Sequence, residues 1–139
     1  MKWSENTVIK ALRLKFSCGD SGYKHLLQQI IPPPSIQTLQ RKLEGLKFDS
    51  GILHEVFKFL KIKVESFKNV ERDCCLVLDE MAITPGKTYD KNLNKYFGNV
   101  TLLNHEGLAT HVLVFMLAGI NARWKQVVAY YSNGNSVND

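Results

Sequence analysis

The first half of the chain places apolar residues at the spacing of α-helices. Ser4 is positioned to cap a first helix, whose inward face repeats at i, i+3 and i+7. The residues on that face are Ile9, Leu12 and Phe16. The stretch S-C-G-D-S-G at 17–22 predicts a break in this helix, and residues 23–29 predict a short second helix.

Three prolines at 32–34 cannot continue a helix, so the chain must turn there before Ser35 caps a third helix. One side of this third helix carries a narrow apolar stripe, made of Ile36, Leu39, Leu43 and Leu46. Asp49 and Ser50 are candidate caps for a fourth helix. We expect one apolar side on it, lined by Ile52, Leu53, Val56, Phe57, Leu60, Val64 and Phe67.

The periodicity changes after residue 73. Residues 74–83 form an almost unbroken apolar run, which predicts a strand buried on both faces. Residues 84–92 then predict a surface loop because they contain Thr-Pro-Gly and polar residues. Further extended segments are predicted at 95–103, 109–117 and 124–131, with a turn at 104–107 and a polar tail at 132–139.

Charge is divided unequally between the two halves. Residues 1–72 carry thirteen Lys/Arg and seven Asp/Glu, for a net +6, whereas residues 73–139 carry five and six, for a net −1. A basic first half fits a polyanionic partner, and a solvated basic surface without a specific partner is the alternative. The three cysteines include no C-x-x-C pair, which excludes a disulfide framework and a zinc site.

Two helices separated by a proline turn favour a helix-turn-helix, in which the second helix enters the DNA major groove. On the 35–46 helix, Gln37, Arg41 and Lys42 are residue types that contact bases or phosphates, and Gln40 lies with Lys42 at the margin. A helical bundle whose polar face is only hydrated is the alternative.

Asp79 and Glu80 interrupt the apolar run at 74–83. Buried carboxylates are rare unless they are paired or bind a metal, and neighbouring strand side chains point to opposite faces. One of the two acids is therefore a candidate ligand for a divalent cation, and an acid solvated or paired with a lysine is the alternative.

The P-G-K-T at 85–88 lacks the first glycine of a phosphate-binding loop, so no nucleotide site is expected. No run reaches the roughly 20 apolar residues of a membrane span, and no membrane partner is expected.

Four stretches together are similar to one known family. L-K-F-D-S-G-I-L at 46–53, V-E-R-D-C-C-L-V-L-D-E-M-A-I-T-P-G-K at 70–87, F-G-N-V-T-L at 97–102 and R-W-K-Q at 123–126 resemble the P element transposase family and its THAP-containing relatives. The resemblance implies an α+β fold. A helix-turn-helix module would occupy residues 1–70, and the first strands of an incomplete, ribonuclease-H-like mixed sheet would occupy residues 71–139.

The resemblance also implies that Asp79 is the first carboxylate of a catalytic triad that binds Mg²⁺, and that Glu80 is not a ligand. The later acids of that triad, a GTP-binding insertion and the THAP finger have no counterpart in this chain. We therefore expect an internal piece of a DNA transposase, or a decayed or domesticated copy, that is inactive alone in metal-dependent strand cleavage. DNA is the expected partner, the nucleus the expected location, and open sheet edges favour self-association.

Overall fold

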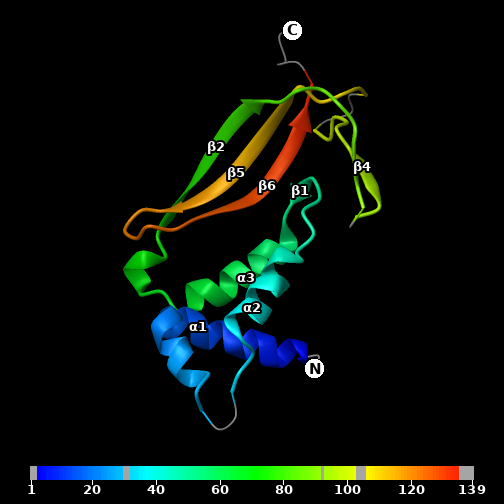
Figure 1. Ribbon diagram of the computed structural model, residues 1–139. Coiled ribbons are helices and arrows are strands. Elements are labelled where there is room, and N and C mark those ends of the chain that lie inside the picture. The colour runs from blue at the N-terminus through cyan, green and yellow to red at the C-terminus, as the bar shows by residue number, and fades with distance from the viewer. Residues whose placement is uncertain (1–2, 30–31, 92, 103–105, 135–139) are drawn as a thin grey trace. The chain divides into compact units, whose positions relative to one another are not determined.

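The structure is a computed structural model that describes residues 3–29, 32–91, 93–102 and 106–134. The chain divides into two compact units (Figure 1). One combines Met1–Leu46 with Glu55–Arg72, and the other combines Lys47–His54 with Asp73–Asp139. Part of the predicted turn at 104–107 and most of the predicted tail lie outside the described residues.

The first helix, α1 (Glu5–Leu26), begins at Ser4, whose hydroxyl oxygen accepts a hydrogen bond of 3.2 Å from the amide of Thr7. The predicted cap is therefore confirmed. Gly19 lies inside α1 with φ 69° and ψ −179°, which is not a helical conformation and divides α1 into two segments. The predicted break at 17–22 is thus also present, as a sharp kink at one glycine.

Two more helices complete the first unit. Ser35 caps α2 (Ile36–Glu44) by accepting from the amide of Thr38 at 3.2 Å, as predicted. The third helix, α3 (His54–Glu65), is followed by a short 3-10 turn, η1 (Asn69–Glu71). None of the described helices combines the length and apolar character that crossing a membrane requires.

The predicted caps of the fourth helix are wrong. Gly51–Ile52 forms a short strand, β1, that pairs with a later strand, and α3 starts only afterwards. The carboxylate of Asp49 instead binds the ammonium of Lys95, 46 positions further along the chain. Ile52 and Phe57 are exposed, so the apolar side predicted for this helix is only partly correct. Long-range strand pairing outweighs the local capping signal here.

The core of the first unit joins all three helices. It contains Val8, Ala11, Leu12 and Tyr23 of α1, Leu39 of α2 and Ile62 of α3. Tyr23 is fully buried, and its hydroxyl donates a hydrogen bond of 2.6 Å to the carbonyl oxygen of Pro34. This bond fixes the segment just before α2. Because Leu39 points into the core, the opposite side of α2 faces solvent.

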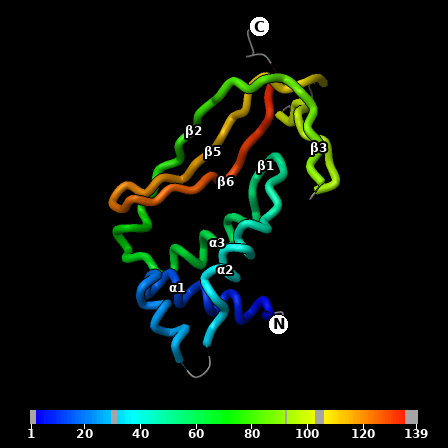
Figure 2. The backbone as a smooth tube through the Cα atoms, viewed as in Figure 1, coloured from blue at the N-terminus to red at the C-terminus, as the bar shows by residue number. Residues whose placement is uncertain are grey.

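The second unit is built on a four-stranded antiparallel sheet in the order β1-β6-β5-β2 (Figure 2). Its long strands are β2 (Cys74–Ala82), β5 (His111–Gly119) and β6 (Lys125–Asn133). A separate hairpin pairs β3 (Thr88–Asp90) with β4 (Lys95–Phe97), where the sequence predicted a loop and a longer strand. Helices followed by strands confirm the predicted α+β fold.

Gly98 closes the base of this hairpin. Its φ is +118°, and a Cβ atom placed there would lie 1.9 Å from the carbonyl oxygen of Gly86. Only glycine therefore allows the two backbone segments to approach so closely. The amide of Ala109 donates to the carbonyl oxygen of Gly98 at 2.7 Å, which links the hairpin to the segment that leads into β5.

The predicted burial of the first strand is wrong. All nine residues of β2 are exposed, although the strand itself lies where it was predicted. Leu76 and Leu78 are each 54% exposed, and on the other face Met81 is 55% exposed. The reason is position: β2 is an edge strand with β5 as its neighbour, and the described residues cover neither of its faces.

Candidate nucleic-acid interface and metal-ligand position

Three of the four residues predicted to contact DNA share one side of α2. Gln37, Gln40 and Arg41 are exposed, and their spacing of i, i+3 and i+4 places them together on a helix surface. The buried Leu39 holds the opposite side of α2 against the core. The helix therefore presents two amides and one guanidinium to solvent, and these groups can bind base edges and phosphates.

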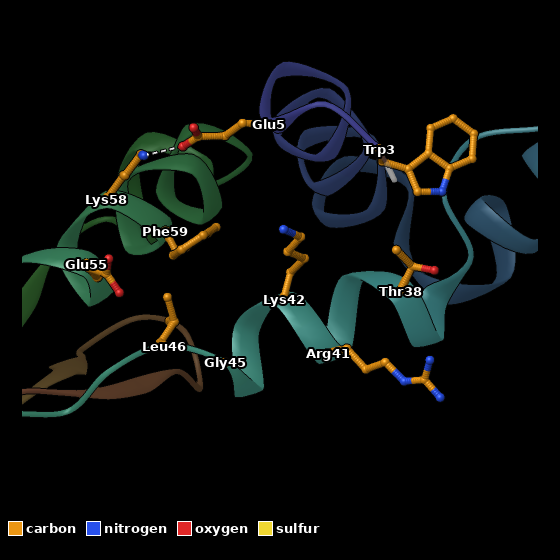
Figure 3. Close-up of a pocket in the computed structure, with 10 residues that line it drawn as sticks. All are labelled: Trp3, Glu5, Thr38, Arg41, Lys42, Gly45, Leu46, Glu55, Lys58 and Phe59. Atoms are coloured by element: carbon orange, nitrogen blue, oxygen red, sulfur yellow. Dashed lines mark hydrogen bonds and ion pairs between the residues drawn. The ribbon is translucent and has the colours of Figure 1, made fainter. Parts of the chain in front are cut away.

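Lys42, the fourth predicted residue, points in another direction. It lines a hollow of about 620 Å³ in the helical unit, which Trp3, Phe59 and Arg41 also border. Figure 3 shows its side chain directed into this hollow, whereas the guanidinium of Arg41 extends away from it. The two neighbouring cations are thus directed to different sides of α2.

The hollow brings acids and cations together. Lys58 donates a hydrogen bond of 2.6 Å to Oε1 of Glu5 (Figure 3). This bond and the charge of Lys58 hold the pKa of Glu5 below its ordinary value, and Lys42 contributes a smaller attraction. The same bond raises the pKa of Lys58. Glu5 therefore offsets part of the positive charge that Lys42 would offer to a phosphate.

The connection before α2 is longer than a tight helix-turn-helix turn. Residues 27–35 separate the end of α1 from the start of α2, where the motif uses three to four residues. Residues 30 and 31 of this connection lie outside the described part of the chain. The packing of Tyr23 and Leu39 in one core nevertheless fixes the second segment of α1 against α2.

Asp79 lies near the middle of β2, opposite Val114 of β5. Its side chain is exposed and shares a face of the strand with Val77 and Met81. Among the described residues, no group of three or more His, Cys, Asp or Glu side chains could hold a metal ion. Two-metal sites need several carboxylates, so the described residues alone do not fit a Mg²⁺ pair.

One feature of the second unit was missed in the sequence. Residues 84–92 were expected to form a loop, yet Tyr89 of β3 pairs directly with Tyr96 of β4, and both rings are exposed. The signal was present as Thr-Tyr-Asp and Lys-Tyr-Phe, two short alternating runs around a polar turn. Trp3 was also missed as a wall of the hollow in the helical unit.

Comparison with known proteins gives one family and one structure. The family model described as TNP-like, RNase H N-terminal domain matches residues 48–139. No curated protein is similar enough to count as a match. The Drosophila P element transposase strand transfer complex is a solved structure with 23% sequence identity and a TM-score of 0.47. That similarity covers 96% of this chain and 28% of the other, so the chain spans less than a third of that protein's length.

Proposed function

The chain belongs to the family of TNP-like RNase H N-terminal domains, and on this basis we propose that it is part of a P element-type DNA transposase. The observation that carries the proposal is the family match over residues 48–139, which covers the whole sheet and the hairpin. DNA is the proposed partner, and the nucleus is the proposed location because the substrate is there.

We assign duplex binding to the helical unit. The exposed Gln37, Gln40 and Arg41 on α2 support this assignment, because these types read adenine and guanine edges in the major groove. The net charge of +6 on residues 1–72 supports it further, since phosphate contacts supply most of the sequence-independent affinity. Lys42, beside Glu5, contributes less than the other three.

Strand cleavage is proposed for the intact parent protein only. Asp79 would be one ligand of a Mg²⁺ site whose other carboxylates are not among the described residues. Bound Mg²⁺ would activate a water or a 3′-hydroxyl and neutralise phosphate charge. Because one carboxylate does not make that site, no cleavage step is assigned to this chain.

A domesticated or decayed protein that binds DNA or other proteins without catalysis is the second candidate. The exposed apolar edge strand β2 favours it, because such an edge invites pairing with another chain. A strand-transfer assay of the intact parent protein, with Asp79→Ala as the control, separates the two candidates. Activity that disappears in the variant supports the enzyme, and equal signals from both proteins support the second candidate.

DNA binding is tested by fluorescence anisotropy of the whole chain with a labelled duplex. We expect affinity to fall steeply between 50 and 200 mM salt, as it does for proteins that neutralise phosphates. Arg41→Ala should weaken binding by about 1–3 kcal/mol, the range for a bidentate base contact. Arg123→Ala removes the same charge from an exposed position in the other unit and is the matched control. Affinity independent of both salt and Arg41 would contradict the assignment.

A further inference from the structure

The β3–β4 hairpin exposes a pair of aromatic rings, which we call the tyrosine platform (Tyr89 and Tyr96). The two residues are direct cross-strand partners, and their ring centroids are 4.9 Å apart with an interplanar angle of 49°. Tyr89 is 44% exposed and Tyr96 is 66% exposed. Cross-strand aromatic pairs stabilise hairpins, but a pair this exposed still leaves apolar ring surface in water.

Polar contacts hold Tyr89 and the hairpin that carries both rings. The hydroxyl of Tyr89 is hydrogen-bonded to Oδ1 of Asn94. The ammonium of Lys95 donates to both carboxylate oxygens of Asp49, at 2.9 and 2.8 Å, and lies 5.8 Å from the ring centroid of Phe97. These contacts attach the hairpin to the segment before β1. A hairpin attached in this way loses less freedom when a ligand binds, which lowers the entropic cost of binding.

Two exposed lysines flank the strand that carries Tyr89. Lys87 directly precedes β3 and Lys91 directly follows it, each two residues from Tyr89. Lys95 is directed to the face opposite the rings, where it pairs with Asp90 across the hairpin and binds Asp49. Glu106 lines a hollow of about 470 Å³ together with Lys87, so part of the charge of Lys87 is offset there.

Exposed aromatic rings beside lysines match the chemistry of single-stranded nucleic acid. Unpaired bases stack on aromatic side chains, and the backbone phosphates lie close to lysine ammonium groups. Duplex DNA does not present these base faces, because its bases are stacked on one another. An uncharged partner would use the rings but not the lysines.

We propose that the tyrosine platform, with Lys87 and Lys91, binds an unpaired stretch of DNA. This proposal rests on the proposed function only in taking DNA as the partner, and it assigns a second DNA contact to the RNase H-type unit. Bases stack on Tyr96 and Tyr89, and the lysines neutralise the adjacent phosphates. The contact does not depend on base identity, because every base has an aromatic face.

The test uses the whole chain and a fluorescein-labelled oligo-deoxythymidine of twelve nucleotides, measured by anisotropy. Tyr96→Leu keeps apolar bulk and removes the aromatic face, and we expect it to weaken binding at least about fivefold. Tyr96→Phe keeps the ring and should bind within about twofold of the unchanged protein. Equal affinity of the Leu and Phe variants would overturn the proposal.

A second test changes a lysine and leaves the packing of the tyrosine rings unaltered. Lys91→Ala should lower the slope of log affinity against log salt by roughly 0.7, the value for one phosphate contact on a single strand. Lys125→Ala is the matched control, because Lys125 is an exposed lysine in the four-stranded sheet, where it pairs with Ala118 of β5, and not in the hairpin. An unchanged slope in Lys91→Ala, or an equal change in Lys125→Ala, would also count against the platform.

The two proposals fail separately. If Arg41→Ala weakens duplex binding but Tyr96→Leu leaves oligo-deoxythymidine binding unchanged, the platform is wrong and the proposed function stands. If Tyr96→Leu weakens single-strand binding but neither salt nor Arg41 affects duplex binding, the platform stands and the α2 assignment fails. Platform-dependent binding that is equally strong for duplex would refute the single-strand preference.

Discussion

Tyr23 shows how much of the helical unit depends on one side chain. Its ring is fully buried in the core, and its hydroxyl donates to the carbonyl oxygen of Pro34 at 2.6 Å. That carbonyl lies one residue before the cap of α2. A buried carbonyl that loses its donor is left unsatisfied, which is more costly than the net value of a hydrogen bond.

We therefore expect Tyr23→Phe to lower the free energy of unfolding by about 1–3 kcal/mol. The measurement is urea denaturation followed by far-ultraviolet circular dichroism, which reports the helices. Tyr96→Phe, at a tyrosine largely exposed to solvent, is the matched control and should change stability by less than about 0.5 kcal/mol. Equal effects from the two variants would contradict the role given to the buried hydroxyl.

The pair Asp49–Lys95 is a second residue-scale test. The hydrogen bond from Lys95 is the main cause that lowers the pKa of Asp49 below its ordinary 3.8, and the amide of Ser50 adds to it. Because the pKa is lower in the folded protein, the contact stabilises it above pH 3.8 and is lost as the pH falls through the lowered folded value.

Lys95→Met should raise the pKa of Asp49 toward 3.8, as measured by a nuclear magnetic resonance titration of its carboxyl carbon. Burial of the carboxyl, which raises its pKa, then outweighs the bond from the Ser50 amide, so the pKa should not stay below that value. Lys91→Met removes an exposed lysine from the same hairpin and should leave the titration unchanged. A pKa unaffected by Lys95→Met would show that the pair does not form in solution.

At this scale the sequence predicted contacts that are local. Ser4 and Ser35 were recognisable as caps because the amides they bind lie three residues away. Asp49 has the same capping chemistry, yet its partner Lys95 is 46 positions away, and spacing rules do not reach that far. The platform was missed for the same reason, since Tyr89 meets Tyr96 only once the hairpin forms.

At the scale of the element, α2 is the most informative part of the candidate site. Helical spacing predicted Gln37 and Arg41 on its polar side, with Gln40 and Lys42 at the margins, and the core contact through Leu39 leaves Gln37, Gln40 and Arg41 exposed together. The spacing did not show that Lys42 would share a hollow with Glu5 of α1 and Lys58 of α3, because those residues lie on other helices.

The cap of α2 can be tested directly. Ser35→Ala removes the oxygen that accepts from the amide of Thr38, and we expect a loss of about 1 kcal/mol. Ser35→Asp supplies another acceptor and places a negative charge at the helix N-terminus, so it should retain stability. Thermal unfolding by circular dichroism measures both. A Ser35→Asp variant as unstable as Ser35→Ala would mean that the cap does not hold this helix.

At the scale of the whole molecule, the change in periodicity and in charge near residue 72 coincides with the start of the long sheet strands. The prediction of one boundary after residue 70 did not include Lys47–His54, which belongs to the sheet unit through β1. Strand β1 has only two residues, which is too short for an alternation of apolar and polar residues to be recognised in the sequence. The amides and carbonyls that pair β1 with β6 are present in any sequence, so only the fold reveals that contact.

The exposed apolar strand β2 gives the last prediction. Its composition is that of a strand covered on both faces, but both of its faces are exposed and it lies at the edge of the sheet. Long apolar edges pair with other chains, so we expect the protein to self-associate as its concentration rises. Lysine on an edge strand opposes such pairing, because its charge must remain hydrated.

Leu78→Lys and Met81→Lys place a charge on opposite faces of β2 and should shift the sedimentation velocity profile toward the monomer. Thr84→Lys adds the same charge at an exposed position just beyond the strand and is the matched control. If only one of the two β2 variants shifts the protein toward the monomer, association uses the face of the sheet that carries that residue. If both act equally, the backbone edge is the contact. Association that persists in both variants would show that β2 is not the surface that joins the chains.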